Sequence, residues 1–261
     1  MPKTYFVAFA DSRYRSQHRI KLEAIAMNFF DEIIVGDERI LEKWYRKKYR
    51  TILNGQGYGY WQWKPYLVRR VMDRMEEGDF LVYTDAGCTL NPNGIPRLNE
   101  YLRITADNPC GILGFDQHRR EAEWTKADLF DYFGVLDNPD YLNHGQVAAT
   151  CFCIQKKFQS QQLIDTWNYI HHNHHYLTTD EPSHLPNDPH FQEHRHDQSV
   201  FSLLSLKYNI ATLPVEEIFT EGDFQTELKD HPIWATRNRM KKRTWQKEIK
   251  YQVKRLLFLN K

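Results

Sequence analysis

The first 36 residues alternate between apolar and amphipathic segments, and this order constrains the fold more than any other feature of the sequence. Residues 5–10 form an apolar run that ends in the polar turn 11–13. In residues 17–30 the apolar side chains recur at helical spacing, and residues 31–36 are again strand-like. A strand, a helix and a second strand in this order predict parallel strands and an α/β fold.

The rest of the chain continues this alternation without an internal repeat or a linker rich in Gly, Ser or Pro. We therefore predict one domain over residues 1–236, with a mainly parallel central sheet flanked by helices. Further strands are expected at 80–83, 110–115, 148–154 and 210–214, and further helices at 40–49, 66–75, 121–133, 158–171 and 200–207.

The C-terminal segment 237–261 differs from this domain in charge. It contains ten Lys and Arg residues and a single acid, Glu248, so its net charge is +9. The whole chain has a net charge of +1, which leaves −8 for residues 1–236. Apolar residues at helical spacing predict a basic amphipathic helix over 245–259, which could lie on an anionic membrane surface or pack on the protein's own domain.

Cysteine use and hydropathy favour a cytoplasmic protein. The four cysteines, Cys88, Cys110, Cys151 and Cys153, have no disulfide-framework spacing, so we expect reduced, buried thiols. No apolar run is long enough to span a bilayer, and the N-terminus lacks the apolar core of a signal peptide. With the basic tail, this predicts peripheral attachment at the inner face of the cell membrane. A nucleic-acid partner is not expected, because the domain is acidic and carries no recognition motif.

Asp85 follows the predicted strand 80–83 almost directly. In open α/β sheets ligands bind beyond the carboxyl ends of parallel strands. A carboxylate there can hold a divalent cation that neutralises nucleotide phosphates. The alternative is that Asp85 serves only as a turn former or a helix cap.

Three segments together carry a family resemblance. They are Gly-Tyr-Gly-Tyr-Trp-Gln-Trp-Lys-Pro at 57–65, Asp-Phe-Leu-Val-Tyr-Thr-Asp-Ala-Gly at 79–87, and His-Asp-Gln-Ser at 196–199 before a helix. This combination resembles GT-A glycosyltransferases, most closely the small bacterial enzymes that build capsule and O-antigen polysaccharides. It covers about residues 4–236. Residues 83–87 match the family's Tyr-x-Asp-x-Asp segment, but Gly87 stands where the family has its second acid.

The resemblance implies a nucleotide-sugar donor, expected to be a UDP-sugar, and a set of residues that bind it. Asp85 matches the acid that contacts the metal or the ribose, with Ala86 and Gly87 beside it. The turn after the first strand matches the region that holds the base, through Phe9, Ala10, Asp11 and Arg13.

The resemblance also implies further donor contacts. Lys64 could meet the diphosphate as a point charge, or be a solvated lysine. Trp61 and Trp63 could pack against the sugar or base, or form a buried pair. Arg237 and Arg239 could close on the diphosphate from the C-terminal side.

The implied cofactor is a divalent cation, Mn²⁺ or Mg²⁺, although Gly87 in place of the second acid leaves metal dependence open. His231 matches the late histidine that often supplies a metal ligand in the family, and its alternative is a solvated loop residue. A separate histidine cluster could form a metal site or a solvated helix end; its members are His171, His172, His174 and His175.

Asp197 precedes the predicted helix 200–207, where the family carries an acid. In inverting members this acid removes the proton of the acceptor hydroxyl, and in retaining members with a similar pattern it lies under the donor sugar. Asp197 could also be only the N-cap of the helix. Acceptor contacts are placed by elimination on the polar stretch Glu123, Trp124, Thr125 and Lys126.

We therefore predict a hexosyltransferase that uses Asp197 as the base and inverts the donor anomeric centre. Its acceptor would be a lipid-linked or oligosaccharide glycan in surface polysaccharide synthesis. The alternatives are a retaining GT-A enzyme and a nucleotide- or glycan-binding protein without turnover.

Overall fold

Strand β1 (Thr4–Phe9) lies between two parallel neighbours, as the opening of the sequence predicts. The computed structural model describes residues 2–238. In it β2 (Glu32–Gly36) and β3 (Phe80–Thr84) pair with β1 in parallel, so that Tyr5 faces Glu32 on one side and Leu81 on the other. The carboxyl ends of β1 and β3 therefore lie at the same edge of the sheet.

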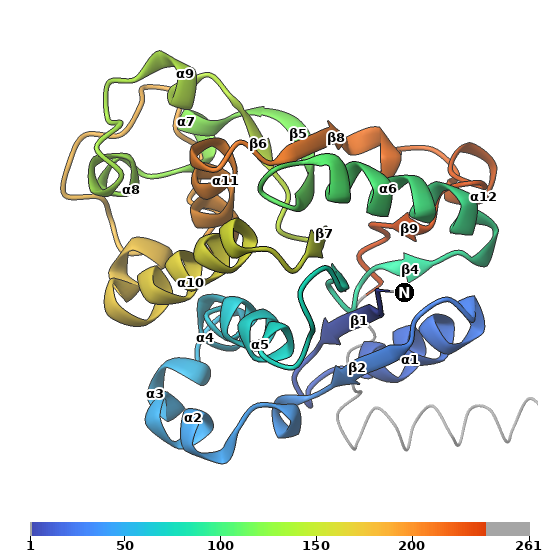
Figure 1. Cartoon of the computed structure of the whole chain (residues 1–261). Helices are drawn as coiled ribbons and strands as arrows, with labels where there is room; N and C mark the ends of the chain where they lie inside the picture. The colour runs from blue at the N-terminus through green and yellow to red at the C-terminus, as the bar shows by residue number, and fades with distance from the viewer. Residues whose placement is uncertain (1, 239–261) are drawn as a thin grey trace, which may run out of the picture.

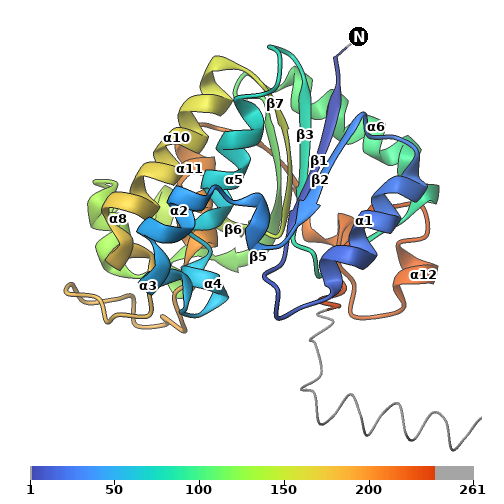
Figure 2. The same cartoon turned by 90° about the horizontal axis from the view of Figure 1, so that it is seen from below.

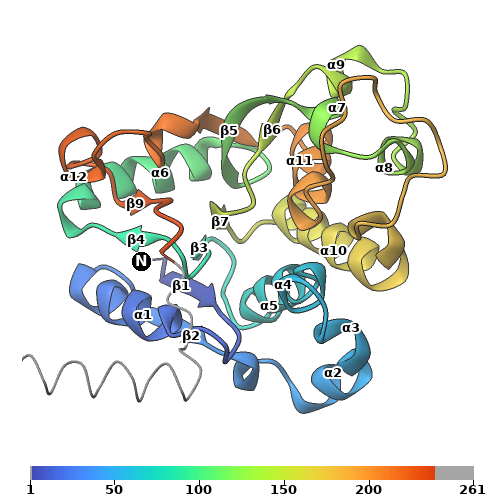
Figure 3. The ribbon, with the colours of Figure 1, turned by 180° about the vertical axis from the view of Figure 1, so that it is seen from behind.

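The remaining strands extend the sheet beyond β3. The order is β2-β1-β3-β7-β5-β6, and β8 pairs with β5. Strand β7 runs antiparallel to β3 and β5, β6 runs antiparallel to β5, and β8 runs parallel to β5. A separate two-stranded ribbon joins β4 to β9 and lies between α1 and α6 (Figures 1 and 3). The strand bounds are β4 Thr89–Leu90, β5 Ile112–Arg120, β6 Gly145–Val147, β7 Cys151–Gln155, β8 Ala211–Pro214 and β9 Ile233–Trp234.

Helices cover both faces of the sheet because apolar side chains point to both sides of its strands (Figure 2). Val7 and Tyr83 belong to the core cluster beneath α5 (Trp63–Met72), α10 (Phe158–Asn173) and α11 (Asp197–Lys207). Their strand neighbours face the other cluster, beneath α1 (Ser16–Met27) and α6 (Ile95–Asp107). The expected α/β fold is confirmed.

Short helices complete the described chain. The α-helical pieces are α2 Lys43–Lys48, α3 Arg50–Leu53, α4 Gly57–Tyr60, α7 Glu121–Trp124, α8 Ala127–Tyr132, α9 Pro139–Leu142 and α12 Phe224–Glu227. The 3-10 turns are η1 Glu38–Ile40, η2 Pro92–Gly94, η3 His175–Thr178 and η4 Val215–Glu217.

The single helix predicted over 121–133 is wrong. The chain breaks between α7 and α8, where Thr125 and Lys126 have extended backbone angles. Lys126 is buried, and its ammonium donates to the carbonyl oxygens of Tyr176 (2.5 Å) and Glu181 (3.2 Å). These contacts join distant segments, so the spacing of apolar residues within 121–133 could not reveal the break.

All four cysteines are buried and unpaired, as expected. Within residues 2–238 no helix combines the length and the apolar character needed to cross a bilayer. The predicted helix 245–259 and Arg239 lie outside the described residues.

Candidate active site

Three charged side chains meet at the carboxyl edge of β1 and β3. Lys64 lies in the first turn of α5, Asp85 follows β3, and Asp197 is the first residue of α11. The Lys64 ammonium is 2.6 Å from Asp197 Oδ2 and 3.2 Å from Asp85 Oδ1. It also donates to the Ala149 carbonyl oxygen at 3.0 Å. Lys64 is therefore a buried bridge between the two carboxylates, and its solvated alternative is wrong.

Burial and ion pairing shift the pKa values of Lys64 and Asp197 in opposite directions. Burial alone lowers the pKa of Lys64, but attraction to Asp197 and Asp85 outweighs it, and the pKa lies above its ordinary value. Burial raises the pKa of the Asp197 carboxyl in spite of its attraction to Lys64. A raised pKa makes Asp197 a better proton acceptor.

Asp85 is the more accessible of the two acids. Its side chain is 35% exposed, whereas the side chain of Asp197 is 7% exposed. Asp85 Oδ1 accepts a hydrogen bond from the Tyr83 hydroxyl at 2.8 Å, and its backbone N–H donates to the Thr150 carbonyl oxygen at 2.7 Å. Asp85 is therefore fixed by the strand while one side of its carboxylate faces the exterior.

Asp197 does not act as an N-cap. The residue before α11, His196, has φ of 56° and makes no side-chain capping bond, and the Asp197 carboxylate contacts Lys64 instead. The His196 ring stacks on Tyr60 at 5.2 Å and its Nε2 lies 2.9 Å from Asp180. Left-handed backbone at a non-glycine residue costs about 1–3 kcal/mol and tends to occur at functional sites.

Segment α4, which leads into Lys64, is a left-handed turn and not a regular α-helix. Five successive residues, 57–61, have φ between 50° and 86°. Glycine is required at its start, because a Cβ on Gly57 would lie 2.6 Å from the Trp61 ring. The Trp63 indole N–H donates to the Gly57 carbonyl oxygen at 3.1 Å and closes the turn. This turn sets the position at which α5 begins and hence the position of Lys64.

The expected base-binding turn lies next to this loop. Phe9 and Trp63 are buried in the core, with ring centroids 4.0 Å apart. Asp11 is buried and pairs with Arg13 at 2.7 Å, and Ala10 is partly exposed. Trp61 is partly exposed, with its ring 5.3 Å from the His196 ring.

The ribbon of β4 and β9 brings Arg237 to the Asp85 turn. The Asn238 N–H and the Thr236 hydroxyl both donate to the Gly87 carbonyl oxygen, at 2.7 Å and 3.1 Å. A Cβ on Gly87 would lie 3.6 Å from the Arg237 Cα. Ala86, by contrast, is buried. The backbone of Arg237 therefore packs against Gly87, the position at which the family has its second acid. The Arg237 side chain is exposed.

His231 lies elsewhere in the fold. Its ring Nε2 is 3.4 Å from Glu217 Oε2, and its carbonyl oxygen accepts from Asn91 at 3.0 Å. Strands β4 and β9 are antiparallel, with Thr89 opposite Trp234. The residues after Trp234 therefore run toward Gly87, and the residues before it, which include His231, run away from Gly87. The structure brings Arg237, and not His231, to the Asp85 turn.

The described residues around Asp85 do not form a cation site from protein ligands alone, and the divalent cation stays a prediction. Across residues 2–238, no three His, Cys, Asp or Glu side chains are grouped so that they could hold a metal ion. The Lys64 ammonium lies between the two carboxylates, where it repels a second cation. In the histidine cluster, His171 is buried and His172 bonds the Tyr45 hydroxyl at 3.0 Å, while His174 packs near Tyr132 and His175 near Tyr60.

Of the four acceptor candidates, two are accessible. Thr125 is buried and donates to Glu121, and Lys126 is buried among backbone carbonyls. Glu123 and Trp124 remain partly exposed. The Trp124 carbonyl oxygen accepts from the Arg195 N–H at 3.0 Å and the Ser199 hydroxyl at 2.8 Å, which ties α7 to the start of α11.

A hydrogen-bonded network behind the site was not predicted. Gln198 donates to Gln146 (2.6 Å), and Gln146 donates to the buried Glu121 (3.1 Å). Gln198 also accepts from the Ala149 N–H, and the Ala149 carbonyl receives Lys64. The sequence did contain a signal for the contact between Tyr83 and Asp85. Every second residue of a strand points to the same face, so these two side chains lie on the same side of the chain.

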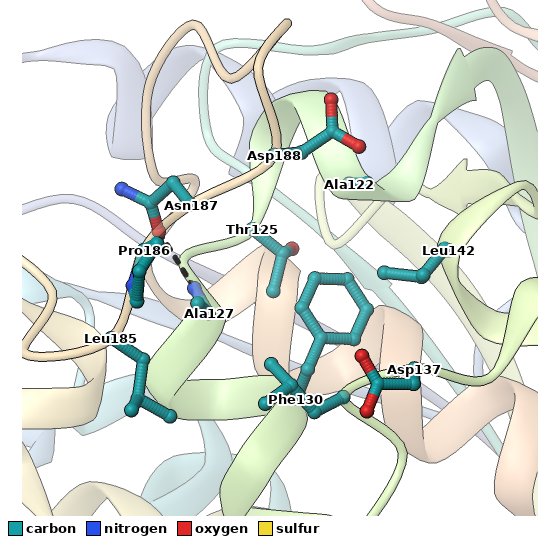
Figure 4. Close-up of a pocket in the computed structure, with 11 residues that line it drawn as sticks. Ala122, Thr125, Ala127, Phe130, Asp137, Leu142, Leu185, Pro186, Asn187 and Asp188 are labelled. Carbon is teal, nitrogen blue, oxygen red and sulfur yellow. Dashed lines mark hydrogen bonds between the residues drawn. The ribbon is translucent and has the colours of Figure 1, made fainter.

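A pocket of about 290 Å³ lies between α7, α8, α9 and residues 185–188 (Figure 4). Phe130, Leu142 and Leu185 contribute apolar surface, and the Ala127 N–H donates to Asn187 Oδ1 at 2.8 Å. Neither Lys64 nor the two carboxylates line it. The candidate site is therefore assigned by its side-chain chemistry and not by this hollow.

No protein-family model matches the chain, and no curated protein matches it. A solved structure does. A glycosyltransferase involved in the glycosylation of the major capsid of PBCV-1 matches with a TM-score of 0.50 and 9% identity, over 89% of this chain and 93% of that chain. The chain has a glycosyltransferase fold.

Two further glycosyltransferase structures match less well and add nothing to that assignment. Mouse xyloside xylosyltransferase 1 in its apo form has a TM-score of 0.45 and 12% identity, over 89% of this chain and 84% of its own. The apo form of GlyE from Streptococcus pneumoniae TIGR4 has a TM-score of 0.39 and 12% identity, over 83% of this chain and 46% of its own. The resemblance to bacterial capsule and O-antigen enzymes stays a prediction.

Proposed function

We propose that this chain transfers a hexose from a nucleotide-diphosphate sugar, a UDP-sugar, to a lipid-linked or oligosaccharide acceptor in surface polysaccharide synthesis. One observation carries the proposal: a buried lysine joins two carboxylates at the ligand-binding edge of a glycosyltransferase fold. Burying the charges of Lys64 and Asp197 is costly, and such groups are concentrated where chemistry needs them.

In the proposed reaction Asp197 is the general base. It takes the proton of the acceptor hydroxyl while that oxygen forms a bond to the anomeric carbon of the donor. The bond from this carbon to the phosphate oxygen breaks on the opposite face, so the configuration inverts and UDP leaves. Asp85 contacts the donor, Lys64 holds both carboxylates in position, and Arg237 offsets the charge on the departing diphosphate.

A retaining reaction is the second candidate, and one observation favours it. Asp197 is only 5% exposed and is held by Lys64, which suits a carboxylate placed beneath the donor sugar better than one that must reach an acceptor hydroxyl. Proton NMR of the product reads the anomeric configuration and separates the two mechanisms.

The test is UDP release from a panel of UDP-sugars mixed with glycan acceptors, with and without EDTA. Asp197→Asn keeps the shape of the side chain but removes its basicity, so transfer should fall about 100-fold or more while UDP binding persists. Asp85→Ala should weaken donor binding. Asp107→Asn, at an exposed position at the end of α6, is the matched control and should transfer normally.

Normal sugar transfer by a folded Asp197→Asn variant would exclude Asp197 as the general base. Binding of UDP-sugars without any UDP release would instead indicate a binding protein. Loss of transfer in EDTA would show that a cation takes part in spite of Lys64.

A further inference from the structure

Two arginines lie over the Trp124 ring. The Arg195 guanidinium carbon is 4.3 Å from the centre of the ring, and that of Arg119 is 4.9 Å away. Arg119 comes from β5, Trp124 from α7, and Arg195 from the segment two residues before Asp197. Three separate segments therefore form a cationic and aromatic surface, and hydrogen bonds from the Arg195 N–H and the Ser199 hydroxyl to the Trp124 carbonyl oxygen tie it to the start of α11, which carries Asp197.

The positive charge at this surface is largely uncompensated. Burial lowers the pKa of Arg195, and repulsion from Arg119 and Arg237 lowers it further, against the attraction of Glu193. Glu193 is the acid paired with Arg195, at 2.9 Å, and its side chain is 58% exposed. Neither Arg119 nor Arg237 is among the arginines of residues 2–238 that pair with an acid. Guanidinium groups brought together in this way favour binding of an anion.

Donor groups at the surface also lack acceptors. Among the described residues, the buried Trp124 Nε1 and Arg195 Nε have no hydrogen-bond partner. Buried donors are normally satisfied, so each of these N–H groups keeps a donor that an acceptor atom of a ligand could take. The planar fork of guanidinium matches the oxygen pairs of carboxylate and phosphate.

We propose that Arg119, Arg195 and Trp124 form an acceptor subsite that selects a sugar carrying a carboxylate or a phosphate. The inference rests on the proposed function, since the subsite takes its role from Asp197. Its Trp124 and Arg195 are tied by hydrogen bonds to the start of α11, which carries Asp197, the proposed acceptor base. Arg237, packed beside Gly87, is near enough to lower the pKa of Arg195, so the Kd for UDP is measured beside the sugar affinities to separate acceptor from donor contacts.

Calorimetry of the full chain, saturated with UDP, tests the subsite with matched pairs of sugars. The pairs are methyl β-glucuronide with methyl β-glucoside, and glucose 6-phosphate with glucose. At least one charged sugar should bind about tenfold or more tightly than its neutral partner. The pair that shows the preference distinguishes carboxylate from phosphate.

Variants then assign the preference to these side chains. Arg195→Gln and Arg119→Gln should each remove most of it while the Kd for UDP stays within about twofold. Arg195→Lys keeps the charge without the fork and should retain part of the preference, which guards against a glutamine variant that fails to fold. Arg103→Gln, at an exposed position on α6, should behave as the unmodified chain does.

Equal binding of both members of both pairs would overturn the proposal, as would a preference that survives both glutamine variants. A parallel loss of UDP affinity in those variants would place the arginines at the donor diphosphate instead. A preference for charged sugars without UDP release from any donor would contradict the proposed function but support the subsite. UDP release without a preference for charged sugars would support the proposed function but contradict the subsite.

Discussion

At the scale of single residues, the Lys64 ammonium determines how the two carboxylates behave. It is 2% exposed and lies within 3.2 Å of both Asp85 and Asp197. Removing one partner of a buried ion pair leaves the other charge without compensation, which is more damaging than removing both.

Lys64→Met should therefore lower the free energy of unfolding by about 3 kcal/mol, because the Asp197 carboxylate stays buried alone. The Lys64→Met, Asp197→Asn double variant should recover part of that loss. Urea denaturation followed by circular dichroism measures both. Arg74→Met, which breaks the exposed pair with Glu32, is the control and should change stability by less than about 1 kcal/mol. If Lys64→Met were as stable as the unmodified chain, Lys64 would not be compensating the charge of a buried Asp197 carboxylate.

At the scale of elements, Glu121 connects α7 to β6 and α11. Its carboxylate accepts hydrogen bonds from Thr125, Gln146 and Ser202, and burial raises its pKa to about 7. Through Gln146 and Gln198 it is joined to the residues that hold Lys64. Glu121 thus lies where three elements fix the position of the site.

The raised pKa gives Glu121 a defined effect on stability. Between its ordinary value and about 7, the folded chain binds this proton more tightly than the unfolded chain does. Its contribution is therefore present at low pH and lost as pH rises from about 5 to about 8. The free energy of unfolding of the unmodified chain, minus that of Glu121→Gln, should decrease over this range in urea titrations. Buried histidines titrate in both proteins, so their effect on the free energy of unfolding cancels when the two values are subtracted. A difference independent of pH would contradict the assignment.

At the scale of the whole molecule, the basic segment 237–261 begins beside the active site. Arg237 lies at the Asp85 turn, so membrane binding by the residues after it would bring the site to a lipid-linked acceptor. Each basic residue near an anionic leaflet contributes about 1 kcal/mol at low salt.

The full chain should therefore float with phosphatidylglycerol vesicles at low salt, and a chain ending at Arg239 should not. High salt, or vesicles of phosphatidylcholine alone, should abolish flotation of the full chain, because the attraction is electrostatic. Identical behaviour of the two chains would contradict membrane binding by the tail.

The sequence by itself determined the elements whose causes are local. The run 5–10, the amphipathic stretch 17–30 and the run 31–36 predicted β1, α1 and β2, because strand and helix periodicity depend on neighbouring residues. The same reasoning placed Asp85 at the carboxyl edge of the sheet, where the structure has it. It missed α6, and it joined α7 and α8, whose separation depends on the contacts of Lys126.

Only the tertiary structure decided which side chains meet. The contact of Lys64 with Asp197, the separation of His231 from Asp85 and the convergence of Arg119 with Arg195 all join segments far apart in the chain. Such pairings are set by how helices pack on the sheet and by the register of strands, and the spacing of residues in one sequence contains neither. For this reason the sequence could propose Lys64 as a phosphate ligand, while only the fold showed it buried between two carboxylates.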